Sequence, residues 1–227
     1  MLKIVFEGHA CFTLQSKEGP TILLDPYISG NPACAKKPAD FKPDLILVSH
    51  GHGDHLGDAL EIAAAADATL AGPVDLWQTQ NTADLKIIGF NMGGSFEFMG
   101  SYIYMAPAWH GSNVDGAYAG LACGYMIRIE GKTIYFAGDT ALFGDMDAVL
   151  SRFEIDYALL PIGGYYTMDP KDAITAAQWL RAKTVIPMHY NTFPVISQDE
   201  LAFKKDLEER TASRCLILKP GEATEVV

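Results

Sequence analysis

Closely spaced cysteines are missing from this sequence. It contains four cysteines that lie far apart and form no C-x-x-C pair: Cys11, Cys34, Cys123 and Cys215. Disulfide frameworks depend on clustered cysteines in secreted chains, whereas scattered cysteines are typical of proteins in a reducing compartment. We therefore predict free thiols and a cytoplasmic location.

Long apolar runs and an excess of positive charge are also missing. No run approaches the roughly 18 apolar residues of a membrane span. Glu7 and His9 fall where a secretory signal would need an apolar core. The 17 Lys and Arg residues are outnumbered by 28 Asp and Glu residues, and the formal net charge of −11 repels polyphosphate backbones. We expect no membrane segment and no nucleic-acid surface, while a small-molecule substrate stays open, even an anionic one held by a local cationic site.

The chain lacks low-complexity linkers, charge runs and close internal repeats as well. Its 227 residues are 49% hydrophobic and 20% charged, which is typical of a packed globular protein. The longest irregular stretch that we predict is a loop over Pro26–Pro43. We therefore predict one domain over residues 1–227.

Strand and helix patterns alternate along the chain. Short runs rich in β-branched and aromatic residues predict strands at Leu2–Phe6, Cys11–Gln15, Thr21–Leu24, Leu45–Ser49, Tyr102–Met105, Gly124–Ile129, Thr133–Phe136, Tyr157–Leu160, Thr184–Pro187 and Cys215–Leu218. Helices are predicted at Gly57–Ala66, Val74–Thr79, Asp145–Leu150, Pro170–Arg181 and Gln198–Glu209. The segment "IRIEGKTIYF" predicts a hairpin that turns at Glu130-Gly131.

The stretch "HGHGDH" directly after an apolar run carries the strongest chemical signal. His50 and His52 are two residues apart, so in an extended segment both point to one side and can bind one ion together. Asp54 and His55 follow Gly53, which can bend the chain toward a second position. A single histidine in such a turn would more often be a structural residue, but neutral imidazoles crowded together gain little unless a cation joins them. The stretch therefore predicts a metal site.

Other potential ligands follow three further predicted strands. His110 comes after "SYIYMAPAW", Asp139 after "TIYFAG" and His189 after "TVIPM". Open sheets bind ligands at the carboxyl ends of their strands, so these side chains are expected to meet the His50 segment. Four strand ends thus supply five histidines and two aspartates, enough for two metal ions that share a carboxylate.

These motifs resemble the metallo-β-lactamase superfamily in order and approximate spacing. The similar stretches are "HGHGDH", "FAGDT" and "PMHYNTFP", together with His110. Three further stretches, "GHACF", "LLDP" and "LPIGG", and the "HYNTFP" part of "PMHYNTFP" resemble the branch of metal-dependent hydrolases similar to L-ascorbate-6-phosphate lactonase. The resemblance implies an αββα sandwich, in which two mixed sheets face each other, helices cover both outer sides and the site lies along one edge.

The resemblance also implies two sets of metal ligands. It gives one ion to His50, His52 and His110, the other to Asp54, His55 and His189, and a bridging role to Asp139. The expected cofactors are two divalent ions, zinc first, with manganese, nickel or iron as alternatives. Hydroxide held between such ions would attack an ester-like bond of a small metabolite, a lactone, carboxylic ester or phosphoester, and Asp54 would orient this nucleophile or relay its proton.

Two further roles are implied by the same resemblance. His9 is similar to a histidine that lines the metal pocket, so substrate contact or proton transfer is expected, although a buried structural histidine explains the pattern equally well. Asp25 in "LLDP" is similar to an aspartate that orients a metal-binding histidine through its free ring N–H. The alternative for Asp25 is an ordinary aspartate at the end of a strand.

The substrate contacts are predicted from position in the chain alone. We expect the site to be rimmed by residues of the long loop and of "GGYYTMDP", and by residues next to the ligands: Tyr27, Tyr165, Tyr166, Met168, Trp109, Phe193, Asn191 and Thr192. Lys36 and Lys37 are candidates for contact with an anionic group. For each of these residues, packing or solvation is the simpler explanation.

Several other functions share these motifs. A nuclease or phosphodiesterase of the same superfamily would resemble this core, and a persulfide dioxygenase would use the fold with a single iron. A non-catalytic structural zinc site is disfavoured because such sites usually include cysteine, and none lies in the motifs. The sequence leaves a dimer or larger homo-oligomer open.

Overall fold

Two seven-stranded sheets face each other in the computed structural model, which describes residues 1–226. The first sheet has the order β16-β1-β2-β3-β4-β5-β6. Its strands are β1 (Leu2–Gly8), β2 (Cys11–Ser16), β3 (Thr21–Leu24), β4 (Leu45–Leu47), β5 (Thr69–Pro73), β6 (Lys86–Phe90) and β16 (Ala223–Glu225). The sheet is mixed, because β1, β2, β3 and β16 pair antiparallel whereas β3 to β6 pair parallel.

The second sheet has the order β15-β14-β13-β12-β11-β8-β7. Its strands are β7 (Ser95–Phe98), β8 (Ser101–Pro107), β11 (Cys123–Ile129), β12 (Lys132–Phe136), β13 (Tyr157–Pro161), β14 (Thr184–Met188) and β15 (Arg214–Cys215). It is also mixed, with antiparallel pairing from β7 to β12 and parallel pairing from β12 to β15. A separate two-stranded ribbon consists of β9 (Asn113–Val114) and β10 (Ala117–Tyr118).

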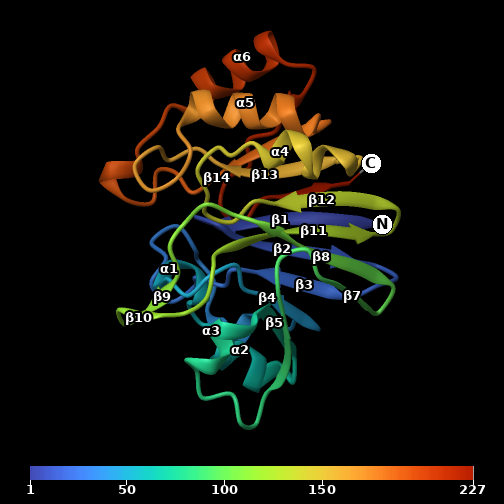
Figure 1. Cartoon of the computed structure of the whole chain (residues 1–227), viewed down its shortest axis with the longest axis vertical. Helices are drawn as coiled ribbons and strands as arrows, with labels where there is room; N and C mark the ends of the chain where they lie inside the picture. The colour runs from blue at the N-terminus through green and yellow to red at the C-terminus, as the bar shows by residue number, and fades with distance from the viewer. Residues whose placement is uncertain (227) are drawn as a thin grey trace.

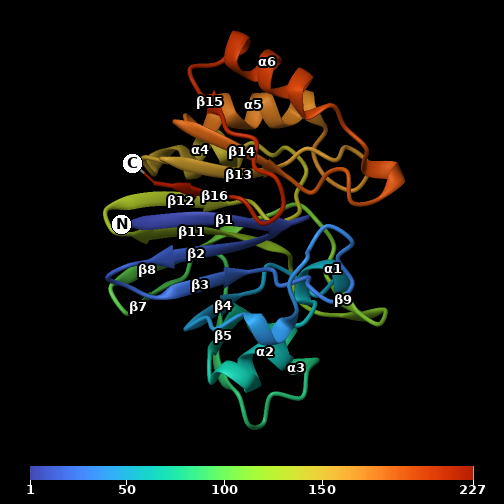
Figure 2. The same ribbon diagram turned by 180° about the vertical axis from the view of Figure 1, so that it is seen from behind.

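Helices lie at both ends of the molecule, with the strands between them (Figures 1 and 2). One end carries α2 (Ala59–Ala66) and α3 (Val74–Gln78), which contact β5. The other carries α4 (Asp145–Ala148), α5 (Pro170–Leu180) and α6 (Glu200–Arg210), of which α5 contacts β13. The short α1 (Gly53–Leu56) and the turns η1 (Pro38–Asp40), η2 (Leu150–Arg152) and η3 (Pro194–Ile196) complete the elements. The predicted αββα sandwich is confirmed.

The main hydrophobic core lies between the two sheets and continues to α5 and α6. Phe12 of the first sheet and Phe136 of the second, both fully buried, pack edge to face with ring centroids 6.5 Å apart. A second cluster, which includes Ile62, Leu70 and Trp77, fills the space between the first sheet and α2 and α3. Because both faces of the central strands are buried, β4 and β13 consist entirely of buried residues.

The predicted strands and helices fall close to the observed ones, and the hairpin turn is confirmed. Glu130 and Gly131 have φ values of 49° and 75°, which only a turn of the primed type requires at both central residues. The helix predicted from Gly57 begins at Ala59 instead, because Gly57 has a φ of 42° and lies against the backbone of Pro26.

The strands β5, β6, β7, β9, β10 and β16 were not predicted from the sequence. In β5, the residues of "TLAGP" include Ala, Gly and Pro, which are depleted in strands, so its pairing with β4 and β6 outweighs its composition. The strand predicted over Cys215–Leu218 was wrong beyond Cys215, since β15 ends there. The predicted loop 26–43 is irregular apart from η1.

The sequence predicts that a membrane span and a disulfide framework are missing. Within residues 1–226, no helix is both long and apolar enough to cross a membrane. The four cysteines, all in this range, are free thiols. The cytoplasmic location stays a prediction.

Hydrogen bonds join the two sheets at the point where the chain leaves β4, and one of them comes from a buried side chain of β11. The hydroxyl of buried Tyr125, on β11, donates to the carbonyl oxygen of Val48 at 2.5 Å. The hydroxyl of Tyr135, on β12, is equally buried but has no hydrogen-bond partner among the described residues. The two tyrosines therefore form a matched pair.

We predict opposite effects of removing these two hydroxyls. Tyr125→Phe leaves the Val48 carbonyl unpaired and should lower the free energy of unfolding by about 1–3 kcal/mol, whereas Tyr135→Phe should change it little or raise it. Urea denaturation of both variants measures this. Equal losses in the two variants would contradict the role given to the Tyr125 bond.

Candidate metal centre

The "HGHGDH" segment carries its side chains toward one place because the chain changes conformation within it. It leaves β4 at Leu47, His52 is extended with φ −66° and ψ 148°, and Gly53 begins α1, which contains Asp54 and His55. His50 and His55 are buried, while Asp54 is 29% exposed. The segment therefore presents ligands from an extended stretch and from a helical turn side by side.

Three imidazoles form the first group of potential ligands. His50 and His52 of this segment lie beside His110, which follows β8, and their donor atoms lie within 4.8 Å of one another. His50 Nε2 is 2.9 Å from His52 Nδ1, and the ring of His110 is 5.1 Å from that of His50. The three rings thus surround one position with nitrogen donors.

A second group lies next to the first. Asp54 and His55 of α1, His189 after β14 and His9 after β1 offer donor atoms within 4.8 Å of one another. Asp54 Oδ2 is 3.9 Å from His55 Nε2 and 3.8 Å from His189 Nε2.

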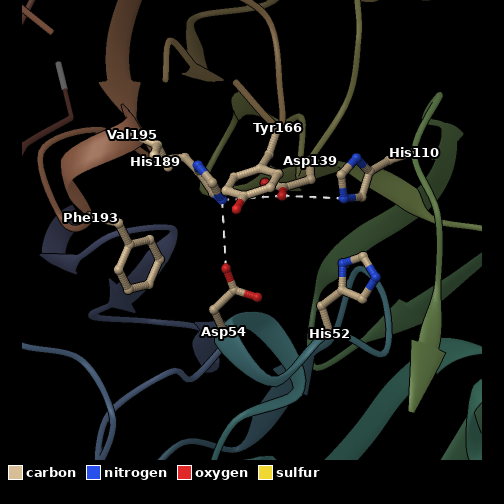
Figure 3. A pocket seen from close by; sticks show the side chains of 8 residues that line it. All are labelled: His52, Asp54, His110, Asp139, Tyr166, His189, Phe193 and Val195. Atoms are coloured by element: carbon tan, nitrogen blue, oxygen red, sulfur yellow. Dashed lines mark ion pairs between the residues drawn. The ribbon is translucent and has the colours of Figure 1, made fainter. Parts of the chain in front are cut away.

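Asp139, which follows β12, lies between the two groups. Its carboxylate is 3.3 Å from His55 Nε2 and 3.1 Å from His189 Nε2 in the second group. It is also 3.5 Å from His110 Nε2 in the first group (Figure 3). One buried carboxylate therefore contacts rings of both groups, which is the placement that a bridging ligand requires.

Several donor atoms of this centre are left without a hydrogen bond in the described part of the chain. His55 Nε2, Asp139 Oδ1 and both ring nitrogens of His189 are buried without a hydrogen bond among residues 1–226. Buried polar atoms are normally paired, and each unpaired one costs about 1–3 kcal/mol. Nitrogen and carboxylate oxygen donors in this number suit zinc and similar divalent ions. The residues therefore fit the metal that their pattern predicts.

The electrostatics of the centre also favour a cation. Burial by itself lowers the pKa of His189, but Asp139 and Asp54 outweigh it and raise the pKa to about 9. Burial acts in the same direction on His55, and Asp139 and Asp25 raise its pKa well above the usual value. These carboxylates thus stabilise positive charge at the centre. A metal ion would supply that charge once the ring protons leave.

Asp25 occupies the place that was predicted for a residue orienting a histidine. Its fully buried carboxylate accepts the Ser49 N–H at 2.7 Å and the Ser49 hydroxyl at 2.5 Å. It also lies 2.6 Å from His55 Nδ1. A proton on Nδ1 satisfies this contact and leaves Nε2 free to face Asp139.

Sequence reasoning missed two other residues that hold ligand rings. Ser49 Oγ lies 2.9 Å from His50 Nδ1, and Asn113 Nδ2 lies 2.9 Å from His52 Nε2. Ser49 directly precedes the histidine motif, which was a usable signal. Asn113 lies in β9, and nothing in the sequence pointed to it.

His9 differs from the other histidines of its group because both of its ring nitrogens already have partners. Nδ1 is 3.0 Å from Thr192 Oγ1, and Nε2 is 3.1 Å from Asp54 Oδ2. Its ring packs against His189 with centroids 4.0 Å apart. Burial lowers the pKa of His9 to about 4, so it is neutral near pH 7. This arrangement suits a positioning role toward Asp54 better than it suits a role as metal ligand.

Three residues of this centre have strained backbone. His9, Asp25 and His189 have φ values of 60°, 40° and 55°, in the left-handed region that non-glycine residues seldom adopt. Each such residue costs about 1–3 kcal/mol and persists where the surroundings fix it, which is common at functional sites.

The centre opens into a hollow of about 420 Å³. It is lined by His52, Asp54, His110, Asp139, Tyr166, His189, Phe193 and Val195. Tyr166 and Phe193, which the sequence predicts at the rim of the site, are among these lining residues, and Val195 is one that the sequence did not indicate.

The other predicted substrate residues do not line this hollow. Tyr165 is exposed, Thr192 contacts His9, and Asn191 accepts a hydrogen bond from the Gln198 N–H at 2.8 Å. The Tyr27 ring lies 5.6 Å from that of His9, and its hydroxyl donates to the Gly30 carbonyl. The expectation for Met168 was wrong, because it is 1% exposed and belongs to the main core. Trp109 and the Lys36–Lys37 pair also lie outside the lining.

Comparison with known proteins places the chain in a family. Residues 3–189 match the model of the beta-lactamase superfamily domain. A UPF0173 metal-dependent hydrolase of Pelotomaculum thermopropionicum is 44% identical over 230 residues, covering 99% of this chain and 100% of that protein. The chain belongs to the UPF0173 metal-dependent hydrolases of the beta-lactamase superfamily. A UPF0173 metal-dependent hydrolase of Thermococcus kodakarensis is also 44% identical, with full coverage of both chains.

The structural comparison agrees with this family. The metallo hydrolase Igni18 of the archaeon Ignicoccus hospitalis has a TM-score of 0.90 and is 35% identical, covering 98% of this chain and 97% of that one. The predicted superfamily is confirmed, and so is the prediction of an enzyme that hydrolyses its substrate with a metal. The closer resemblance of this UPF0173 hydrolase to ascorbate-phosphate lactonases stays a prediction.

The Asp25–His55 contact generates a testable expectation about metal affinity. Asp25→Asn keeps an acceptor for Ser49 but removes the charge that holds His55, so the affinity for zinc should fall by about 10–100-fold. Competition with a chromophoric chelator measures it. Asp44→Asn is the control, because Asp44 Oδ2 accepts the Thr21 N–H at 2.8 Å at the opposite end of β4. An Asp25→Asn variant with unchanged affinity would remove Asp25 from this role.

Proposed function

We propose that this hydrolase holds two divalent metal ions and cleaves an ester-like bond of a small metabolite, a lactone, carboxylic ester or phosphoester. The observation that carries the proposal is the position of Asp139, whose carboxylate contacts histidines of both ligand groups. Zinc is the first candidate, and manganese, nickel and iron accept the same ligands. Divalent ions held there would supply Lewis-acid chemistry, which activates water and polarises the bond to be cleaved.

The ligand assignment follows the two groups of donor atoms. His50, His52 and His110 would hold one ion, and Asp54, His55 and His189 the other, with Asp139 shared between them. His9 stays outside both sets because its two ring nitrogens are engaged.

Asp54 is the residue best placed to move a proton. It lines the hollow and is partly exposed, so its carboxylate can meet a water molecule there. Burial raises the pKa of Asp54, but the contacts with His189 and His9 outweigh it and hold the pKa well below the usual value. The carboxylate is therefore ionised and can orient water or accept its proton, while His9, fixed by Thr192, keeps Asp54 in place.

The two alternative functions have less support. A persulfide dioxygenase would need a single iron, whereas the two groups joined by Asp139 favour two ions. A nuclease or phosphodiesterase would need cationic groups for the polyphosphate backbone, and the lining of the hollow includes no Lys or Arg among residues 1–226. The partner that we propose is thus a small molecule, and a homo-oligomer stays a prediction.

Removing the shared carboxylate tests the dinuclear arrangement. Asp139→Ala should reduce the zinc content from two ions to one per chain and lower kcat by about a hundredfold or more, because both ions lose a common ligand. Elemental mass spectrometry and ester hydrolysis measure the two effects. Asp145→Ala, at the exposed start of α4, is the control. An Asp139→Ala variant with two ions and full activity would contradict the bridging role.

A change at His9 should separate activity from metal content. His9→Ala should keep the metal content and reduce kcat by about 10–100-fold, since Asp54 loses the partner that orients it. Thr192→Val should give a smaller loss of the same kind, because it frees only His9 Nδ1. Loss of metal in His9→Ala would instead show that His9 is a ligand.

A further inference from the structure

The hollow above the metal centre has a polar side and an apolar side. Figure 3 shows Phe193 and Val195 beside His189, across the hollow from His52 and His110. Tyr166 adds an aromatic ring to the lining. Val195 and Tyr166 are 53% and 54% exposed, although most large apolar side chains of this protein are buried. Exposed apolar surface that converges on a concave site is typical of ligand binding.

The apolar side extends beyond the hollow. Tyr165 is 68% exposed and packs edge to face on Tyr166, with ring centroids 4.8 Å apart. Phe193 packs in the same way against His9, with centroids 5.3 Å apart. Aromatic rings held by such contacts form a fixed wall, so a ligand that covers them loses little conformational entropy of the protein.

Apart from the metal centre itself, no lysine or arginine of residues 1–226 lines the same hollow to meet an anionic substrate. Asp54 and Asp139 do line it. Lys36, the sequence candidate for such a contact, lies 2.8 Å from the buried carboxylate of Glu7 and lines a separate hollow. A phosphate or carboxylate remote from the reacting bond would therefore find no ionic partner and would be opposed by the net charge of −11.

We propose that the substrate is an uncharged ester or lactone with an aromatic or alkyl group, and that this group lies against Phe193, Val195 and Tyr166 on the His189 side. The inference rests on the proposed function, because it names the substrate class of that same site. A hollow of about 420 Å³ has room for such a molecule. Metabolites that carry a phosphate remote from the reacting bond are accordingly poor substrates.

Matched probes test this selectivity. The acetate esters are para-ethylphenyl acetate and para-carboxymethylphenyl acetate, which share the reacting bond and differ at the distal end. The corresponding acetamides serve as slowly reacting ligands for calorimetric binding to the zinc-loaded protein. We expect the neutral member of each pair to be favoured roughly tenfold or more, in kcat/KM for the esters and in Kd for the amides.

The two readouts separate this inference from the proposed function. If neither ester is cleaved but the neutral amide binds more tightly than the anionic one, the proposed ester hydrolysis is contradicted and the proposed selectivity is supported. If the anionic amide binds as tightly as the neutral one or more tightly, the selectivity is overturned whatever the esters show.

A pair of lysine substitutions locates the apolar group. Val195→Lys places a cation on the apolar side and should reduce the preference for the neutral probe to near equality. Leu201→Lys is the control, because Leu201 is 69% exposed on α6 and lies outside the lining, so the preference should be unchanged. An unchanged preference in Val195→Lys would overturn the inference. If sedimentation also changes in that variant, the exposed apolar side chains form a contact between copies of the chain.

Discussion

The buried carboxylate of Asp139 and the imidazoles around it are the interaction on which the rest of the site depends. His55 Nε2 and His189 Nε2 lie 3.3 Å and 3.1 Å from this carboxylate, and neither makes a hydrogen bond with any of residues 1–226. Burying such groups costs free energy unless a cation compensates them. A bound metal ion would make ligands of these unpaired atoms, so metal binding explains the centre as a whole and packing alone explains it poorly.

The sandwich brings these groups together because its strands end at one edge. Asp25 and the His50 segment follow β3 and β4 of the first sheet, while His110, Asp139 and His189 follow β8, β12 and β14 of the second. Neither sheet alone would supply both ligand groups. The bond from Tyr125 to the Val48 carbonyl ties the second sheet to the segment that carries His50, so core packing fixes the separation of the ligands.

The centre could be predicted from the sequence because its chemistry is concentrated in short motifs at strand ends. Asp25 was predictable for the same reason, since it ends the apolar run "TILLD". Asn113 could not be found, because a two-residue ribbon places it beside His52 and its neighbours carry no pattern. Strands such as β5 and β16 were missed because their pairing partners, distant in sequence, decide their conformation.

The residues that line the hollow were harder to predict than the potential metal ligands. Phe193, Trp109 and Asn191 all lie next to a potential ligand in sequence, but only Phe193 lines the hollow, because the direction of each side chain depends on the local backbone. Asn191 has a φ of 58° and bonds to the Gln198 N–H, which holds its amide outside the hollow. Val195 enters the hollow through η3, a turn that periodicity does not indicate.

Calorimetric titration of the metal-free chain with zinc, with hydrolysis followed at each addition, tests the central claim most directly. The account predicts binding of two zinc ions per chain and activity that rises until the second is bound. Saturation at one ion, or full activity with a single iron, would contradict it.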